Sequence, residues 1–135
     1  MRIVFLVVFL CYSALVISQS NNLFSNAKPI DEYRYEGVRA SPYQFDTWVP
    51  ATIFTSQGDP IQVDELNING YSKEIEIRRG DKFIELDQSA YSRIEISLRD
   101  ETQHVLVRNF ANNFRTRFIE LVHDGAKIKC VRQFL

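Results

Sequence analysis

Apolar and polar residues alternate along most of the chain between residues 73 and 108. Isoleucine, leucine and valine recur at every second position, and glutamates occupy many of the positions between them. Successive side chains of an extended chain point to opposite faces, so each run has one apolar and one polar face. Turn-forming residues separate the runs at 79–81, 87–89 and 100–103. The pattern predicts an antiparallel β-meander with one buried face.

The first hairpin of this meander is expected to turn at residues 80–81. Glycine at the first of two turn positions favours a type II′ turn. This turn places Ile77 opposite Ile84 and Ile75 opposite Leu86, which makes one face of the hairpin entirely aliphatic.

The next hairpin is expected to turn through four residues, 100–103. Leu98 then faces Val105 on the apolar side, and Glu95 faces Arg108 on the polar side. Opposite charges across a strand pair contribute about 0.2–1 kcal/mol, so both faces favour this register.

The last hairpin is expected to turn at residues 124–125, an Asp-Gly pair typical of a type I′ turn. Ile119 then faces Cys130 on the apolar side, which predicts a buried thiol. The same register places Arg117 opposite Arg132. Two guanidinium groups repel each other, so we expect either a carboxylate of the chain or an external anion between them. The acidic residues expected within reach are Asp31, Glu32 and Glu36.

The N-terminal half shows weaker strand signals. In the run 61–68 the apolar positions change parity across Asp64 and Glu65, as they do at a β-bulge. Pro50 predicts an edge position or a bulge in the strand around it. The segment 33–54 holds six aromatic residues. We expect them to fill the core, with a ligand cavity or a sugar-stacking surface as alternatives.

These elements predict an all-β protein, because no segment shows a convincing helical period. The expected fold is an antiparallel β-sandwich of about six to eight strands, with a small closed β-barrel as the alternative. The single β domain is expected to span residues 33–135, after a flexible segment at 21–32.

Residues 1–20 have the pattern of a signal peptide. Met1 and Arg2 precede an apolar run of about fifteen residues, which is short of the roughly 20 that a spanning helix needs. A membrane anchor is the alternative. Cleavage removes Cys11 and leaves Cys130 as the only cysteine. The secreted protein is therefore expected to hold no internal disulfide and to be stabilised by its core alone.

Basic residues gather toward the C-terminus, although the formal net charge of the chain is −1. A basic sheet edge can bind sulfated glycans or another anion, or simply be a solvated edge. The candidate anion-binding residues are Arg115, Arg117, Lys127, Lys129 and Arg132. The chain is slightly acidic overall, so no nucleic-acid partner is expected.

Arg79, Gly80 and Asp81 form a tripeptide that resembles the one displayed by many integrin-binding proteins. The resemblance covers only these three residues. It implies that Arg79 enters an acidic pocket of the receptor and that the Asp81 carboxylate completes a divalent-metal site there. The alternative is an ordinary hairpin turn with one charge on each side.

No catalytic or metal-binding pattern is visible in the sequence. His104 and His123 are the only histidines, and neither lies in a ligand-spaced cluster. We therefore predict a secreted, non-enzymatic protein that binds an extracellular protein or a sulfated glycan, without cofactor, metal or membrane attachment. The alternative is a small extracellular carrier that holds an apolar ligand inside a barrel or sandwich.

Secretion is expected to remove the first eighteen to twenty residues. Intact-mass analysis of the protein recovered from the medium measures this directly. A mass that still includes residues 1–17 would contradict the signal peptide.

Overall fold

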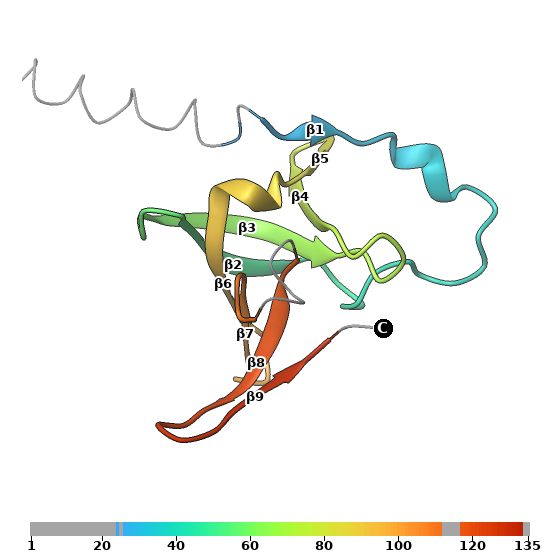
Figure 1. Ribbon diagram of the computed structural model, residues 1–135. Coiled ribbons are helices and arrows are strands. Elements are labelled where there is room, and N and C mark those ends of the chain that lie inside the picture. The colour runs from blue at the N-terminus through green and yellow to red at the C-terminus, as the bar shows by residue number, and fades with distance from the viewer. Residues whose placement is uncertain (1–23, 25, 112–116, 134–135) are drawn as a thin grey trace, which may run out of the picture.

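The computed structural model describes residues 24, 26–111 and 117–133, so the expected signal peptide lies outside the described part of the chain. The described residues form nine strands and two short 3₁₀ helices (Figure 1). In chain order they are β1 (Lys28–Pro29), η1 (Glu32–Tyr35), β2 (Val49–Thr55), β3 (Pro60–Ile68), β4 (Ile75–Arg79), β5 (Lys82–Glu85), η2 (Gln88–Ala90), β6 (Tyr91–Ser97), β7 (Gln103–Val107), β8 (Ile119–Asp124) and β9 (Lys129–Arg132). The all-β prediction is confirmed.

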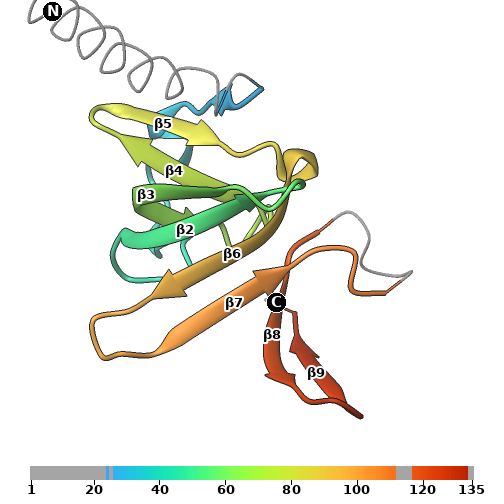
Figure 2. The ribbon, with the colours of Figure 1, turned by 90° about the vertical axis from the view of Figure 1, so that its left-hand side faces the viewer.

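All nine strands belong to one antiparallel sheet with the order β1-β5-β4-β3-β2-β6-β7-β8-β9. Strands β2 to β5 form one meander, and β6 returns to the free side of β2 to begin a second meander that ends at β9 (Figure 2). The sheet is open, with β1 and β9 at its edges, so its hydrogen bonding does not close a barrel.

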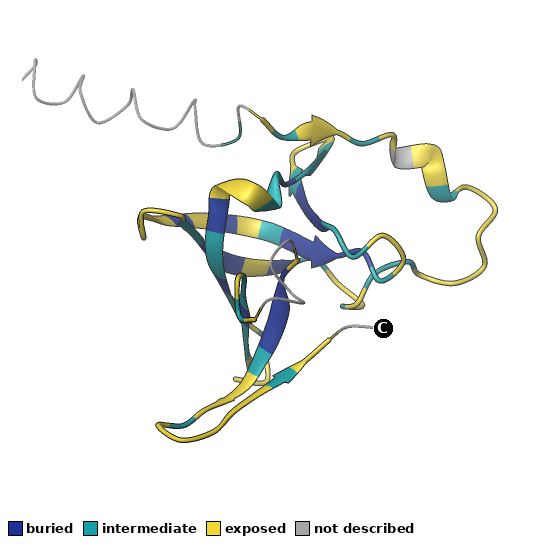
Figure 3. Ribbon diagram, in the orientation of Figure 1, coloured by how far each residue is buried: buried dark blue, intermediate teal, exposed yellow. Residues whose placement is uncertain are grey.

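The core lies on one face of this coiled sheet. Five side chains on the central strands are completely buried: Ile53, Leu66, Ile94, Ile96 and Leu106. The alternation along each strand brings these residues to a common face, which appears as dark bands across β2, β3 and β6 (Figure 3). Burial of such aliphatic side chains contributes about 1.5–3 kcal/mol each and is the main stabilising term of the sheet.

The β4–β5 hairpin has the predicted register. Ile77 pairs with Ile84, and Arg79 pairs with Lys82 across a two-residue turn. Of the two turn residues, only Gly80 has a positive φ, at +64°. A positive φ at the first central position alone is the signature of a type II′ turn, so the predicted turn type is confirmed.

The predicted bulge in β3 is also present. Val49 pairs with Leu66 and Ala51 pairs with Val63, so Asp64 and Glu65 together lie opposite Pro50. Proline has no N–H to donate to a ladder, and the bulge provides a place for it inside the sheet. Pro50 therefore lies at a bulge in a central strand and not at an edge.

The predicted register of the β6–β7 hairpin is wrong. Ile94 pairs with Leu106 and Glu95 pairs with Val105, which differs from the expected register by three residues. The loop is shorter than expected, because the Leu98 N–H donates to the Thr102 carbonyl at 2.9 Å. An odd shift exchanges the two faces of a strand, so Leu106 fills the core in place of its valine neighbours.

The predicted turn of the β8–β9 hairpin is also wrong. Gly125 directly follows β8 and donates its N–H to the Ile128 carbonyl at 3.0 Å, so the turn lies at residues 126–127. A Cβ atom on Gly125 would lie 2.6 Å from Nε2 of His123. Glycine therefore allows the His123 side chain to lie close to the backbone at this position. The sequence alone does not distinguish this role of a glycine from a role in a turn.

The changed register overturns two expectations for the C-terminal hairpin. Cys130 pairs with His123 rather than Ile119, and its thiol is free and exposed instead of buried. Arg132 pairs with Glu120, so it does not lie opposite Arg117. The Arg132 guanidinium does bind a carboxylate, but this carboxylate belongs to Glu120 of the neighbouring strand and not to one of the N-terminal acids.

Ile53 provides a test of the core, because it is fully buried on a strand paired on both sides. Ile53→Ala is expected to lower the unfolding free energy by about 2–5 kcal/mol through lost burial and a cavity. Val122→Ala, at a side chain 59% exposed, is the matched control and should change it by less than about 0.5 kcal/mol. Urea denaturation measures both, and equal effects would contradict the assigned core.

Candidate functional site

Part of the polar face of β3 and β4 is not exposed to solvent. Glu76, Asn67 and Asn69 are almost completely buried, although each alternates with an inward-pointing aliphatic residue. A buried carboxylate requires partners that replace its hydration. The segment that precedes β2 supplies them.

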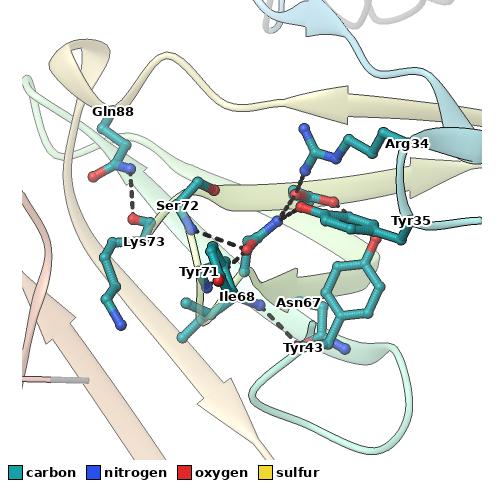
Figure 4. A network of polar contacts seen from close by, with 11 residues as sticks. Arg34, Tyr35, Tyr43, Asn67, Ile68, Tyr71, Ser72, Lys73 and Gln88 are labelled. Carbon is teal, nitrogen blue, oxygen red and sulfur yellow. Dashed lines mark hydrogen bonds and ion pairs between the residues drawn. The ribbon is translucent and has the colours of Figure 1, made fainter. Parts of the chain in front are cut away.

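Glu76 lies at the centre of a polar network. Figure 4 shows Arg34, Tyr35 and Tyr43, which belong to this network. Arg34 of η1 forms an ion pair with its Oε1 atom. The Tyr43 hydroxyl donates to Oε2 at 2.9 Å, and Asn69 Nδ2 donates to Oε1 at 2.8 Å. Asn69 Nδ2 also donates to the Tyr35 hydroxyl. The carboxylate thereby holds the segment 34–43 against the outer face of the sheet.

The two buried asparagines extend this network to the backbone. Asn67 accepts from the Phe45 N–H at 3.2 Å and donates to the Phe45 carbonyl at 2.9 Å. Asn69 Oδ1 accepts from the N–H groups of Tyr71 and Ser72, which shapes the turn before β4. The two asparagine side chains thus pair with backbone groups of the loops before β2 and β4.

The environment of Tyr43 strongly affects the pKa of its phenol. Burial, together with the nearby Glu76 carboxylate, raises the pKa of the Tyr43 phenol well above its ordinary value. Both effects disfavour a second negative charge at this place. The phenol therefore stays protonated and remains a hydrogen-bond donor to Glu76.

The aromatic residues of the N-terminal segment do not fill the core as expected. Tyr35, Tyr43, Trp48 and Phe83 form a chain of ring contacts with centroid separations of 6.3, 5.2 and 5.6 Å on the outer face of the sheet. Phe45 is the exception, since it packs against the core and contacts the His104 ring at 5.5 Å. The aliphatic strand residues alone fill most of the interior.

A groove of about 830 Å³ lies between this aromatic segment, the β3 bulge and the β6–β7 turn. Its lining residues are Gln44, Phe45, Asp46, Thr47, Trp48, Val49, Pro50, Asp64, Glu65, Ser97, Leu98, Arg99 and Asp100. Four of them are acidic and one is basic, so the groove has a net negative charge. Apolar contact surface is available from Trp48 and Leu98.

Hydrogen bonds favour the charged form of two groove carboxylates, Glu65 and Asp100. Hydrogen bonds from the Arg78 guanidinium lower the pKa of Glu65, and Arg78 lies 5.6 Å from the centroid of the Trp48 ring. Hydrogen bonds from Thr102 lower the pKa of Asp100. Asp46 and Asp64 are exposed. The arrangement suits a cation, or a partner with basic side chains.

The integrin-type tripeptide lies at the tip of the β4–β5 hairpin. Arg79, Gly80 and Asp81 are all exposed there. The Arg79 guanidinium lies 5.5 Å from the centroid of the Phe24 ring. The structure therefore presents the tripeptide to solvent on a rigid two-residue turn.

The predicted basic residues are not brought together as one patch. Arg115 lies outside the described residues, and Arg117 lines an open groove of about 640 Å³ far along the sheet from the final turn. Lys127 is at that turn. Lys129 forms an ion pair with Asp124 at 2.7 Å, and Arg132 forms one with Glu120 at 2.6 Å. Two of the four described cations are thus already neutralised.

Glu120 is a second buried carboxylate that sequence reasoning missed. Its place between Ile119 and Leu121 in the alternating pattern indicates a solvent-facing side chain, but Glu120 is buried on the same face as Leu106. His104 Nδ1 lies 2.7 Å from its Oε1, and Arg132 Nε donates to its Oε2 at 2.7 Å. A polar residue at an alternate strand position looks the same in the sequence whether water or another segment covers it.

Among the described residues, no group of three or more histidine, cysteine, aspartate or glutamate side chains is placed to hold a metal ion. The same part of the chain has no helix with the length and apolar character needed to cross a membrane. Comparisons with protein-family models, curated proteins and solved structures find no match to this chain.

The raised pKa of the Tyr43 phenol predicts that the protein becomes less stable at alkaline pH. Above about pH 10, the ordinary tyrosine pKa, the unfolded chain releases this proton while the folded chain keeps it. Rising pH favours the state with fewer bound protons, so the unfolding free energy should fall. Urea denaturation between about pH 8 and 11 should give a shallower fall for Tyr43→Phe than for the unmodified protein. Equal pH slopes would contradict the assigned environment.

Proposed function

We propose that this protein is a secreted, non-enzymatic binding protein whose acidic groove accepts a basic segment of an extracellular partner protein. The observation that carries the proposal is the groove itself, whose lining combines four carboxylates with Trp48. Lysine and arginine side chains combine a charged end with an aliphatic stem, and both parts match this lining.

Electrostatics favours a basic protein over a sulfated glycan. Sulfate groups would be repelled by the exposed Asp46 and Asp64. At the β9 edge of the sheet, the ion pairs of Lys129 and Arg132 reduce the positive charge available to an anion. A glycan role for the C-terminal hairpin therefore has less support than a protein role for the groove.

Preorganisation also supports binding at the groove. One wall is the β2–β3 bulge, where Pro50 of β2 lies opposite Asp64 and Glu65 of β3. Another wall is the segment 44–48, which Asn67 fixes through hydrogen bonds to Phe45 and Thr47. Walls that are ordered before binding lose little conformational freedom when a partner arrives.

An internal carrier function has weaker support. Phe118 and Ile119 line the same cavity as Ile68 and Ile75, which favours a partly opened barrel over a sandwich. That cavity measures about 20 Å³, room for about one water molecule and too little for an apolar ligand.

The non-enzymatic part of the proposal rests on the two buried carboxylates. Glu76 is engaged by Arg34, Tyr43 and Asn69, and Glu120 by His104 and Arg132. Groups with all their oxygens occupied by internal donors are suited to structural roles. We therefore assign them to stability and not to acid–base chemistry.

Binding by the groove is tested with a fluorescent peptide of alternating lysine and leucine and its glutamate counterpart. The protein is expected to bind the lysine peptide preferentially, with an affinity that falls as salt is added. The double variant Asp46→Asn/Asp64→Asn should weaken binding about tenfold or more, because two attractive charges are lost. Fluorescence anisotropy measures the dissociation constants.

The matched control is Glu36→Gln/Asp81→Asn, which removes two exposed charges outside the groove lining. It should retain the binding of the lysine peptide. Equal losses in both variants, or no preference for the lysine peptide, would overturn the groove proposal. The control also lacks the Asp81 carboxylate, so selective loss of adhesion to integrin-bearing cells by this variant would assign the function to the β4–β5 turn instead.

A further inference from the structure

The two edges of the sheet differ in how well they are protected. The edge strand β1 has only two residues, Lys28 and Pro29, and a proline cannot donate to a further strand. At the other end, β9 comprises Lys129–Arg132 without a proline, and its outer side has no partner within the described chain. Figure 2 shows the β8–β9 hairpin projecting away from the rest of the sheet.

The charges on β9 do not protect this edge in the usual way. Edge lysines and arginines normally keep two sheets apart because they stay charged and solvated. Here Asp124 neutralises Lys129, and Glu120 neutralises Arg132, from the neighbouring strand. Two copies of this hairpin can therefore approach each other with little repulsion.

Exposed apolar side chains on the β8–β9 hairpin also favour association. Val122 is 59% exposed and Ile128 is 66% exposed, and they are two of the five large apolar side chains that are exposed in the described chain. Ile128, Cys130 and Arg132 follow one another at spacing two, so their side chains share one face of β9. A strand added beside β9 would cover part of this face.

The backbone of β9 specifies how a second strand would pair. The Ile128 carbonyl accepts from Gly125 of the neighbouring strand, so it points inward. Backbone groups alternate along a strand, which directs those of Cys130 inward as well and those of Lys129 and Val131 outward. A two-fold antiparallel pairing that uses both outward residues places Lys129 opposite Val131 of the other copy and Cys130 opposite Cys130.

We propose that β9 forms an antiparallel strand pair with β9 of a second copy of this chain, in a register centred on Cys130. The resulting interface is isologous and joins two nine-stranded sheets into one continuous sheet. The blunted β1 edge limits this association to a dimer, because only one edge of each copy is able to pair.

The proposed register also brings the two thiols within bonding distance. Opposed residues whose backbone groups point away from each other have Cα atoms about 4.5 Å apart, inside the range of about 4.4–6.8 Å that a disulfide spans. Oxidised glutathione can act as the oxidant. The two thiols release two protons and two electrons to form one S–S bond, and the glutathione disulfide is reduced to two thiols.

The association is tested first on the reduced protein by size-exclusion chromatography with light scattering. We expect a mass that doubles with rising protein concentration. Amide hydrogen exchange of Lys129 and Val131 should slow by about tenfold or more in the dimer, because their N–H groups become paired. Unchanged mass, or exchange at these two amides that is independent of concentration, would overturn the proposal.

Three variants separate strand pairing from chance disulfide formation. Val131→Pro removes an outward N–H and should abolish the dimer, whereas Val131→Thr keeps that N–H and should retain it. Cys130→Ser should dimerise without a covalent bond. In a glutathione redox buffer the unmodified protein should give a covalent dimer on a non-reducing gel, and Val131→Pro should give at least about tenfold less.

The controls for folding are circular dichroism and urea denaturation of each variant. If Val131→Pro does not fold, the concentration dependence of amide exchange in the unmodified protein still decides the question. A covalent dimer that forms equally in folded Val131→Pro would show that exposed thiols react without strand pairing and would overturn the proposed interface.

Discussion

The buried carboxylate of Glu76 is the constraint on which much of this structure depends. An ionised group without water is costly unless opposite charge and hydrogen-bond donors surround it. Arg34 and Tyr43 reach Glu76 from the segment before β2, and Asn69 reaches it from β3. The sheet therefore cannot keep this charge buried unless the N-terminal segment lies across its outer face. Removing one partner would leave an uncompensated charge, which costs about 3–5 kcal/mol in comparable buried pairs.

That covering segment also determines where a binding surface lies. Because it lies over β3 to β5, Trp48 packs between Tyr43 and Phe83 and becomes part of the acidic groove. The bulge at Pro50 turns Asp64 toward the same place. A polar network on one face of the sheet and a backbone irregularity in its central strands together create the candidate site, although neither is itself a recognition motif.

The C-terminal hairpin depends on different interactions. Glu120 binds Arg132 and His104 at the point where the core ends, and beyond it the hairpin extends without further cover from the described residues. Two of its cations, Lys129 and Arg132, are neutralised locally by carboxylates of β8. The hairpin thus combines an unblocked strand edge with exposed apolar side chains, a combination that a second sheet edge can satisfy.

The sequence by itself determined the all-β class, the type II′ turn at Gly80 and the bulge opposite Pro50, because each depends on local alternation or on the backbone limits of glycine and proline. Only the tertiary structure decided the registers of the β6–β7 and β8–β9 hairpins, in which Leu106 and Gly125 serve packing rather than alternation or turn formation. It also decided that Glu76 and Glu120 are buried and that Cys130 is exposed. Alternation assigns a residue to one of two faces. Whether that face is covered depends on segments distant in the chain, and no local pattern records their position.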